Sequence, residues 1–125
     1  MGRELTGKRI LVVEDEYYIA SDLKRLLTSA DATVIGPVAA LEAGLSLIEC
    51  ESLDAAVLDV NLEGIFSYAI ADRLTERAIP YLFLTGYDDW ALPAAYRPIP
   101  RVTKPFLERT MLLTVERLCA ATAAA

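Results

Sequence analysis

The sequence predicts an α/β domain in which helices cover both faces of a parallel sheet. Short apolar runs alternate with segments of helical periodicity along nearly the whole chain. Runs that are apolar throughout are typical of parallel strands buried on both faces. With 125 residues, 54% of them hydrophobic, the chain is expected to form one domain over 1–125, with a core from about residue 8 to residue 118.

Five short runs are expected to be strands because they are apolar and contain β-branched or aromatic residues. They cover residues 9–13, 32–35, 55–58, 81–84 and 101–103. We expect Gly36 and Pro37 to end the second strand, and Asp59 to close the third.

Four segments show the spacing of amphipathic helices. The first covers residues 16–29, and the stripes of the others are Leu41, Leu45 and Ile48; Phe66, Ile70 and Leu74; and Leu107, Met111, Val115 and Leu118. Pro105 is expected in the first turn of the last helix, and the alanine-rich end beyond Leu118 is expected to fray. This alternation suits a flavodoxin-like fold with strand order 2-1-3-4-5.

The segment between Thr85 and Arg101 breaks the rhythm. A further covering helix belongs there, but residues 93–100 include three prolines. Because proline inside a helix costs about 3 kcal/mol, at most a single turn near Asp88 is expected. Long loops in compact domains are often functional or mobile, so we expect this segment to move.

The composition argues against several classes of function. A net charge of −6 argues against direct binding of nucleic acid, and no apolar run approaches the roughly 20 residues that cross a bilayer. No secretory signal is visible, so a cytoplasmic location is expected. A chain without histidine cannot carry phosphate on an imidazole. Cys50 and Cys119 are expected to be reduced thiols in or near the core, and a zinc site is not expected.

Four short polar pieces follow the expected strands. They are Glu14–Asp15, Asp59, Thr85–Gly86 and Lys104–Pro105. Each piece alone is most simply a cap or turn. In a parallel sheet with right-handed crossovers, however, these strand ends meet at one edge. Carboxylates crowded together repel one another unless a cation lies among them, which predicts a site for Mg²⁺ or another divalent cation.

The residue types indicate a role for each side chain. Asp59 is the candidate phosphoacceptor, because its carboxylate can attack phosphorus and form an acyl phosphate. Thr85 and Lys104 are expected to hold phosphoryl oxygens. The expected metal ligands are Glu14, through water, Asp15, Asp59 and the backbone carbonyl of Asn61.

With these residues the chain resembles the receiver domains of two-component response regulators. The matching positions, within a resemblance from Lys8 to about Leu118, are Glu14–Asp15, Asp59, Thr85 and Lys104–Pro105–Phe106. The resemblance implies phosphoryl transfer from a histidine kinase to Asp59, with Mg²⁺, and reset by hydrolysis. Such a domain is a signalling phosphoacceptor rather than an enzyme for other substrates, and it acts by binding proteins.

Residues 79–87 and 58–62 are similar to the FAT GUY group of receivers. That group often stands alone or accompanies stress signalling in α-proteobacteria, and its fourth helix is reduced. Common receivers have an aromatic switch residue where this chain has Arg101. We therefore expect phosphorylation to pull Thr85 inward and reorganise residues 86–100. Asn61 and Tyr87 are expected to tune the lifetime of the phosphate.

Three other interpretations stay open. A receiver-like scaffold without phosphorylation, or a phosphate sink for a kinase, would have the same fold. A phosphatase of the haloacid dehalogenase kind would also use an aspartyl phosphate. That chemistry requires a second Asp as general acid where this chain has Asn61, which disfavours it. The protein target and the oligomeric state are left open.

Overall fold

The computed structural model describes residues 4–86 and 92–124, and it is built around a parallel sheet. The strand order is β2-β1-β3-β6-β7, which is the predicted 2-1-3-4-5 arrangement. The strands are β1 (Arg9–Val13), β2 (Thr33–Val38), β3 (Ala55–Asp59), β6 (Tyr81–Thr85) and β7 (Arg101–Thr103). The predicted α/β fold class is therefore confirmed.

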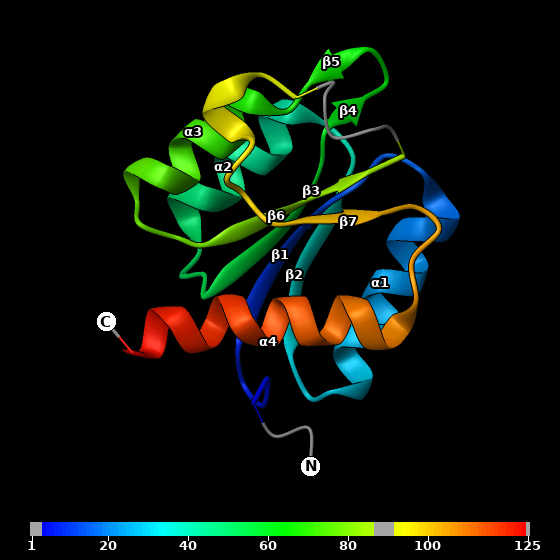
Figure 1. Ribbon diagram of the computed structural model, residues 1–125, viewed down its shortest axis with the longest axis vertical. Helices are drawn as coiled ribbons and strands as arrows, with labels where there is room; N and C mark the ends of the chain where they lie inside the picture. The colour runs from blue at the N-terminus through cyan, green and yellow to red at the C-terminus, as the bar shows by residue number, and fades with distance from the viewer. Residues whose placement is uncertain (1–3, 87–91, 125) are drawn as a thin grey trace.

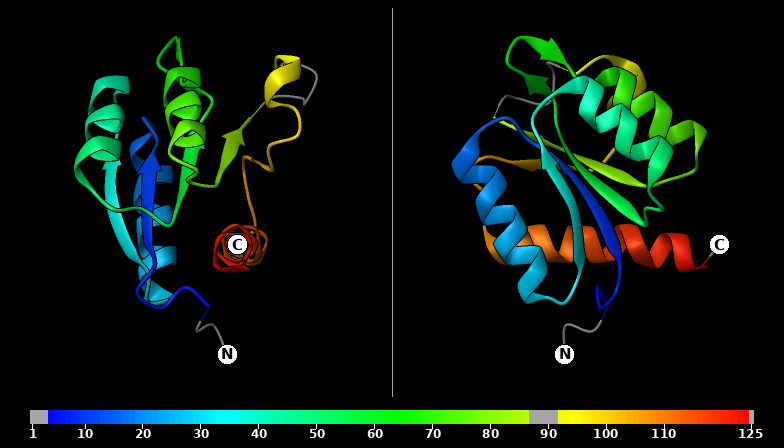
Figure 2. Two further views of the ribbon diagram at one scale, coloured as in Figure 1. Left: turned by 90° about the vertical axis from the view of Figure 1, so that its left-hand side faces the viewer. Right: turned by 180° about the vertical axis from the view of Figure 1, so that it is seen from behind.

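Helices cover both faces of the sheet. In Figure 1, α1 and α4 lie on one side of the strands, and α2 and α3 lie on the other. The right-hand view of Figure 2, seen from behind, shows α1 next to α4. An ion pair links these two helices, with Arg25 Nη2 3.1 Å from Glu108 Oε2. The helices are α1 (Tyr17–Ser29), α2 (Leu41–Cys50), α3 (Tyr68–Glu76) and α4 (Glu108–Ala124).

Two apolar layers hold the helices to the sheet. Ile10 and Val12 of β1 pack with the layer of α1 and α4, whereas Leu11 and Val13 pack with the layer of α2 and α3. Successive side chains of a strand point to opposite faces, so an unbroken apolar run serves both layers. The polar ends of the strands are thereby carried on a rigid, buried support.

Strand β2 does not end where the sequence predicted. It runs through Gly36 and Pro37 to Val38, and its pairing with β1 shifts between Leu11 and Val13. Gly36 has φ +98°, and a Cβ there would lie 3.0 Å from the carbonyl oxygen of Val12. Proline is tolerated because β2 is an edge strand.

A small hairpin follows the third strand of the sheet and was not predicted. β4 (Asn61–Leu62) pairs antiparallel with β5 (Ile65–Phe66), and the turn between them has positive φ at Glu63 and Gly64. The assignment of Phe66 to the third helix was wrong, since Phe66 lies in β5 and is 56% exposed. Its helix-like spacing to Ile70 and Leu74 is therefore coincidental.

The proline-rich segment packs beside α3. Within the described residues 92–100 the only helix is a short 3-10 turn, η2 (Ala94–Tyr96), as the prolines predicted; the turn expected near Asp88 lies outside the described residues. Tyr96 stacks on Tyr68 with ring centroids 4.5 Å apart, and its hydroxyl donates to Asp72 Oδ1 at 2.7 Å. Burial and this bond raise the pKa of Tyr96 to about 12.

Two smaller predictions near the helix ends were wrong. The last helix begins at Glu108, so Pro105 precedes it and Leu107 is 74% exposed. Both cysteines are free, but only Cys119 is buried and Cys50 is exposed. Within the described residues, no helix has both the length and the apolarity to cross a membrane.

Candidate functional site

The structure places the four polar pieces at one edge of the sheet. Glu14 and Asp15 follow β1, Asp59 ends β3, Thr85 ends β6 and Lys104 follows β7. Carboxylate oxygens from Glu14, Asp15 and Asp59 lie within 4.8 Å of one another. Parallel strands connected by helical crossovers bring about this convergence, because all their carboxyl ends face the same way.

The two most buried acids are each held by a nearby backbone amide. Glu14 is 2% exposed, and its Oε2 accepts a hydrogen bond from the amide of Glu16 at 2.9 Å. Asp59 is 5% exposed, and its Oδ1 accepts from the amide of Asn61 at 3.2 Å. In both cases the donor lies two residues beyond the acid, so the turn after the strand orients the carboxylate.

Lys104 is the cation that contacts both acids. Its Nζ lies 3.1 Å from Glu14 Oε1 and 3.2 Å from Asp59 Oδ2. Its backbone amide donates to the carbonyl of Thr85 at 2.8 Å, which fastens the end of β7 to the end of β6. Burial alone would lower the pKa of Lys104, but Asp59 and Glu14 together raise it above its ordinary value.

Burial and crowding change the protonation of Asp59. Desolvation, followed by the negative charge of Glu14, raises the pKa of Asp59 to about 7, although Lys104 and the Asn61 amide act in the opposite direction. A raised pKa means that the ionised carboxylate lacks full compensation from the protein atoms around it. A cation bound nearby would therefore stabilise the ionised form of Asp59.

An open pocket of about 430 Å³ lies over these groups. It is lined by Asp15, Glu16, Asp59, Val60, Asn61, Glu63, Thr85, Gly86 and Lys104. Glu16 and Glu63 were not among the predicted site residues. The Asn61–Gly64 stretch is a turn signal that could have located Glu63 at the tip of a hairpin.

The donor set fits a hard divalent cation. Carboxylate oxygens are the ligands that Mg²⁺ prefers, and three of the acids lie close enough to share one ion. Glu14 Oε1 is buried and accepts no hydrogen bond from the described residues, although it lies near Lys104 Nζ. A water molecule bound to the cation would satisfy this oxygen.

Of the two predicted switch residues, the structure describes Arg101, which is not among the residues that line the pocket. Arg101 is in β7, opposite Phe83, and its Nη1 donates to the carbonyl of Arg97 at 2.9 Å. Tyr87 lies outside the described residues. Asn61 does line the pocket, and its side-chain Oδ1 accepts from the amide of Gly64 at 2.7 Å.

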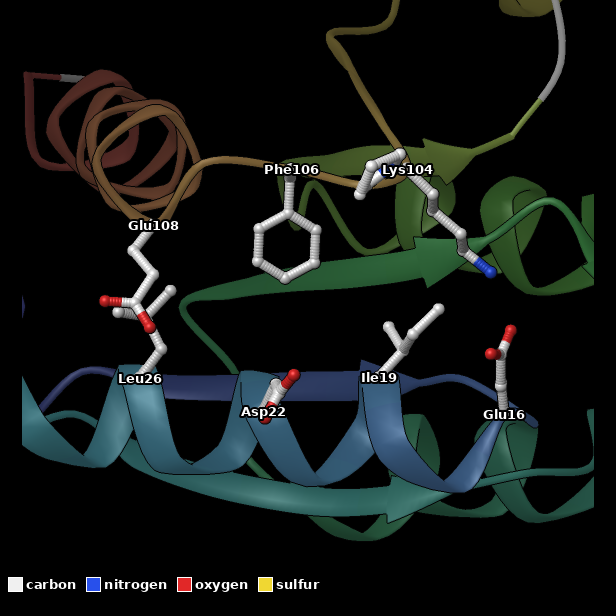
Figure 3. A pocket seen from close by; sticks show the side chains of 8 residues that line it. Glu16, Ile19, Asp22, Leu26, Lys104, Phe106 and Glu108 are labelled. Carbon is white, nitrogen blue, oxygen red and sulfur yellow. The ribbon is translucent and has the colours of Figure 1, made fainter.

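A second hollow of about 490 Å³ runs along α1. Figure 3 shows Ile19 and Leu26 on α1 facing Phe106, with the ammonium of Lys104 pointing toward Glu16. Glu16 and Lys104 line both hollows, so this apolar groove adjoins the acidic pocket. Asp22 and Glu108 also border the groove, and Arg25 pairs with both.

The fold and the acidic pocket agree with a comparison to known families. The model of the response regulator receiver domain matches residues 10–115. The chain belongs to the response-regulator receiver family. The resemblance drawn from the sequence is therefore confirmed, and the chain is a signalling domain of two-component systems.

Curated relatives of this receiver domain are regulatory proteins. It is 35% identical over 89 residues to the positive alginate biosynthesis regulatory protein of Pseudomonas aeruginosa. The matched region covers 68% of this chain and 36% of that protein. It is 30% identical over 112 residues to the regulatory protein VanR of Enterococcus faecium, covering 86% of this chain and 48% of VanR. The receiver thus spans about a third to a half of these relatives.

Solved structures share its fold over most of its length. SdrG from Sphingomonas melonis Fr1 is 36% identical, with a TM-score of 0.80 over 90% of this chain and 96% of SdrG. The response regulator PhyR from Brucella abortus is 26% identical, with a TM-score of 0.84 over 98% of this chain and 53% of PhyR. A beryllofluoride-activated SdrG is also similar, with a TM-score of 0.79, 35% identity and coverage of 91% of this chain and 98% of that one.

Proposed function

We propose that this receiver accepts a phosphoryl group on Asp59 from a histidine kinase, with Mg²⁺ as the cofactor. The observation that carries this proposal is the position of the Asp59 carboxylate, which opens onto a polar pocket while Glu14, Asp15 and Lys104 surround it. One sheet with both helical layers underlies the site, so we also propose that residues 1–125 act as a single domain.

The chemistry is an in-line transfer. An oxygen of the Asp59 carboxylate attacks phosphorus, the new O–P bond forms, and the P–N bond to the donor histidine breaks with its electron pair leaving on nitrogen. Lys104 exchanges its contact with Asp59 for a phosphoryl oxygen, and Thr85 donates its hydroxyl to another. Bound Mg²⁺, held by Glu14, Asp15, Asp59 and the Asn61 carbonyl, would neutralise phosphoryl charge.

Hydrolysis of the aspartyl phosphate would end the signal. We propose that Asn61, which lines the pocket, controls the approach of water to the phosphorus. We assign the same control to Tyr87. The protein would then promote only its own phosphorylation and dephosphorylation, and it would not turn over other phosphate esters.

The groove along α1 is the proposed docking surface for the kinase. It shares Glu16 and Lys104 with the pocket, so a helix seated there can present its phosphohistidine to Asp59. The apolar side chains of Ile19 and Phe106 suit the contact.

Phosphorylation is proposed to change protein–protein contacts in the cytoplasm. Thr85 is 5% exposed at the end of β6, immediately before the segment that leads to η2. A phosphoryl group that draws Thr85 inward would pull on residues 86–100, with Arg101 replacing the usual aromatic switch residue. The acidic net charge of −6 supports a protein target rather than a nucleic acid.

The decisive experiment is incubation with acetyl phosphate and Mg²⁺, followed by intact-protein mass spectrometry. The wild type should gain one phosphoryl group, whereas Asp59→Asn should gain none, because the nucleophilic carboxylate is missing. Asp31→Asn, the same substitution at an exposed turn, should be modified like the wild type.

Other outcomes would point to the alternatives. A folded wild type that stays unmodified would favour a scaffold without phosphorylation. Turnover of a generic phosphate ester would favour a phosphatase. Equal modification of Asp59→Asn would move the acceptor to another residue.

A further inference from the structure

Ser67 lies beneath the phosphoacceptor and is not among the residues already assigned to the site. Its side chain is completely buried, at 0% exposure, and it belongs to the short list of buried polar residues that otherwise contains Glu14, Asp59 and Thr85. Ser67 is the residue that connects the β4–β5 hairpin to α3.

The hydroxyl of Ser67 does not play the role that its position suggests. Serine before a helix normally caps it, with its oxygen accepting from an amide in the first turn. Ser67 is the N-cap residue of α3, yet its side chain makes no capping hydrogen bond. The hydroxyl lies 2.5 Å from the backbone carbonyl oxygen of Asp59 and 3.2 Å from that of Val60, so it donates backward to the end of β3.

These bonds close the base of the hairpin onto Asp59. The backbone amide of Ser67 also donates to the carbonyl of Val60, at 2.9 Å. The chain between the two ends of this clamp carries Asn61 and Glu63, which line the pocket, and the Asn61 amide donates to Asp59 Oδ1. The Ser67 hydroxyl therefore contacts Asp59 at its backbone carbonyl, whereas Asn61, which lies between Asp59 and Ser67 in the chain, contacts the Asp59 carboxylate.

We propose that Ser67 is a positioning residue for the phosphoacceptor, acting through the Asp59 carbonyl and the base of the β4–β5 hairpin. The proposal rests on the proposed function of Asp59. Without the hydroxyl, the carbonyl of Asp59 loses a buried donor and the hairpin base loosens. The carboxylate and the Asn61 carbonyl would then be less well oriented for a shared cation.

The test compares Ser67→Ala with the wild type in three measurements. These are the Mg²⁺ dissociation constant from calorimetry, the initial rate of modification by acetyl phosphate, and the amide resonance of Asn61 in NMR spectra. Ser67→Ala should weaken Mg²⁺ binding and slow modification by roughly tenfold, the lower end of the effect of groups that orient metal ligands. The Asn61 resonance should shift, since its hydrogen bond to Asp59 changes.

Ser29→Ala is the matched control. Ser29 also donates its hydroxyl to a backbone carbonyl, that of Leu26 at 2.6 Å, but it lies in the last turn of α1. Its loss is expected to leave all three measurements unchanged, even if the melting temperature falls. A change of stability alone would therefore not be mistaken for positioning.

The outcomes separate this proposal from the proposed function. A folded Ser67→Ala that binds Mg²⁺ and is modified at the wild-type rate would overturn it, while Asp59→Asn would still report on the acceptor. If Ser67→Ala does not fold, Ser67→Cys, with a weaker donor, decides in its place: a rate of modification below that of the wild type supports the proposal, and a wild-type rate overturns it. If the wild type itself is not modified, the function fails, and the Asn61 resonance and Mg²⁺ affinity still test Ser67.

Discussion

Glu14, Asp59 and Lys104 bury two negative charges against one positive charge. The lysine lies 3.1–3.2 Å from an oxygen of each acid, so a net negative charge remains in a poorly hydrated place. Burying uncompensated charge is unfavourable, and the raised pKa of Asp59 reflects this. The same excess of negative charge favours the binding of a cation. The buried charge that destabilises the free protein therefore supports its proposed function.

The raised pKa predicts a pH-dependent effect of Asp59→Asn on stability. Since the pKa of Asp59 is about 7 in the folded protein and 3.8 is its ordinary value, the folded state holds a proton between these values that the unfolded chain has released. Wild-type stability should therefore fall as pH rises from about 4 to about 7. Asp59→Asn lacks this loss, so its free energy of unfolding relative to wild type should be higher at pH 8 than at pH 5, by on the order of 2 kcal/mol.

Urea unfolding in metal-free buffer at the two pH values measures this difference. Asp31→Asn, an exposed control, should show no such dependence. An Asp59→Asn effect that is equal at pH 5 and pH 8 would contradict the burial of an ionisable carboxyl at this position.

Among the elements, the β4–β5 hairpin, α3 and η2 are joined by a row of aromatic rings. Phe66 stacks on Tyr68 at 5.2 Å, and Tyr68 stacks on Tyr96 at 4.5 Å. Phe83 of β6 makes T-shaped contacts with both Tyr68 and Tyr96. The segment that replaces a covering helix is thus held by specific ring contacts rather than by helical packing, which leaves it easier to rearrange.

Tyr96→Ala should release this segment. Loss of the ring stack and of the bond to Asp72 should weaken amide protection in residues 92–100 by about 1–2 kcal/mol. Hydrogen exchange followed by mass spectrometry measures this, and Tyr18→Ala, which removes a 77% exposed tyrosine, is the control.

In the wild type, Mg²⁺ with beryllofluoride should alter exchange in the same segment, residues 92–100. Unaltered exchange would argue against the proposed switch.

In the molecule as a whole, the sheet and its two apolar layers stabilise a fold in which the crowded acids of the site are destabilising. Apart from Leu5, the largest fully buried side chains belong to the strands and helices, whereas the crowded acids lie at the strand ends. Because the strands are buried on both faces, the acids cannot move apart without disturbing both layers. A ligand that binds only the folded state should therefore stabilise the entire domain.

Magnesium should raise the melting temperature of the wild type. At a concentration about 100 times the dissociation constant, binding to the folded state alone adds about 2.7 kcal/mol to stability. Asp15→Asn removes one ligand and should abolish most of this gain, whereas Asp31→Asn should retain it. Differential scanning calorimetry with Mg²⁺ and with EDTA measures the shift. An equal shift in Asp15→Asn would show that the ion binds elsewhere.

Most of the fold and most of the candidate site were predictable because both depend on short patterns. The strand ends at Glu14, Asp59, Thr85 and Lys104 lie where the apolar runs stop, and parallel topology then brings them to one edge. Phe66 was assigned wrongly because its spacing matched a helix, and Glu63 was missed because the turn beyond Asn61 was not recognised.

Sequence patterns alone were enough to predict the alternation of strands and helices, the strand order and the residues that meet at the acidic edge. These follow from local periodicity and from rules of chain connection. The three-dimensional fold was needed to show that the Ser67 hydroxyl donates back to the carbonyl of Asp59, that β2 continues through Gly36, and that Tyr96 stacks on Tyr68. Such contacts depend on the detailed packing of side chains and backbone in three dimensions, which the periodicity of a single segment does not encode.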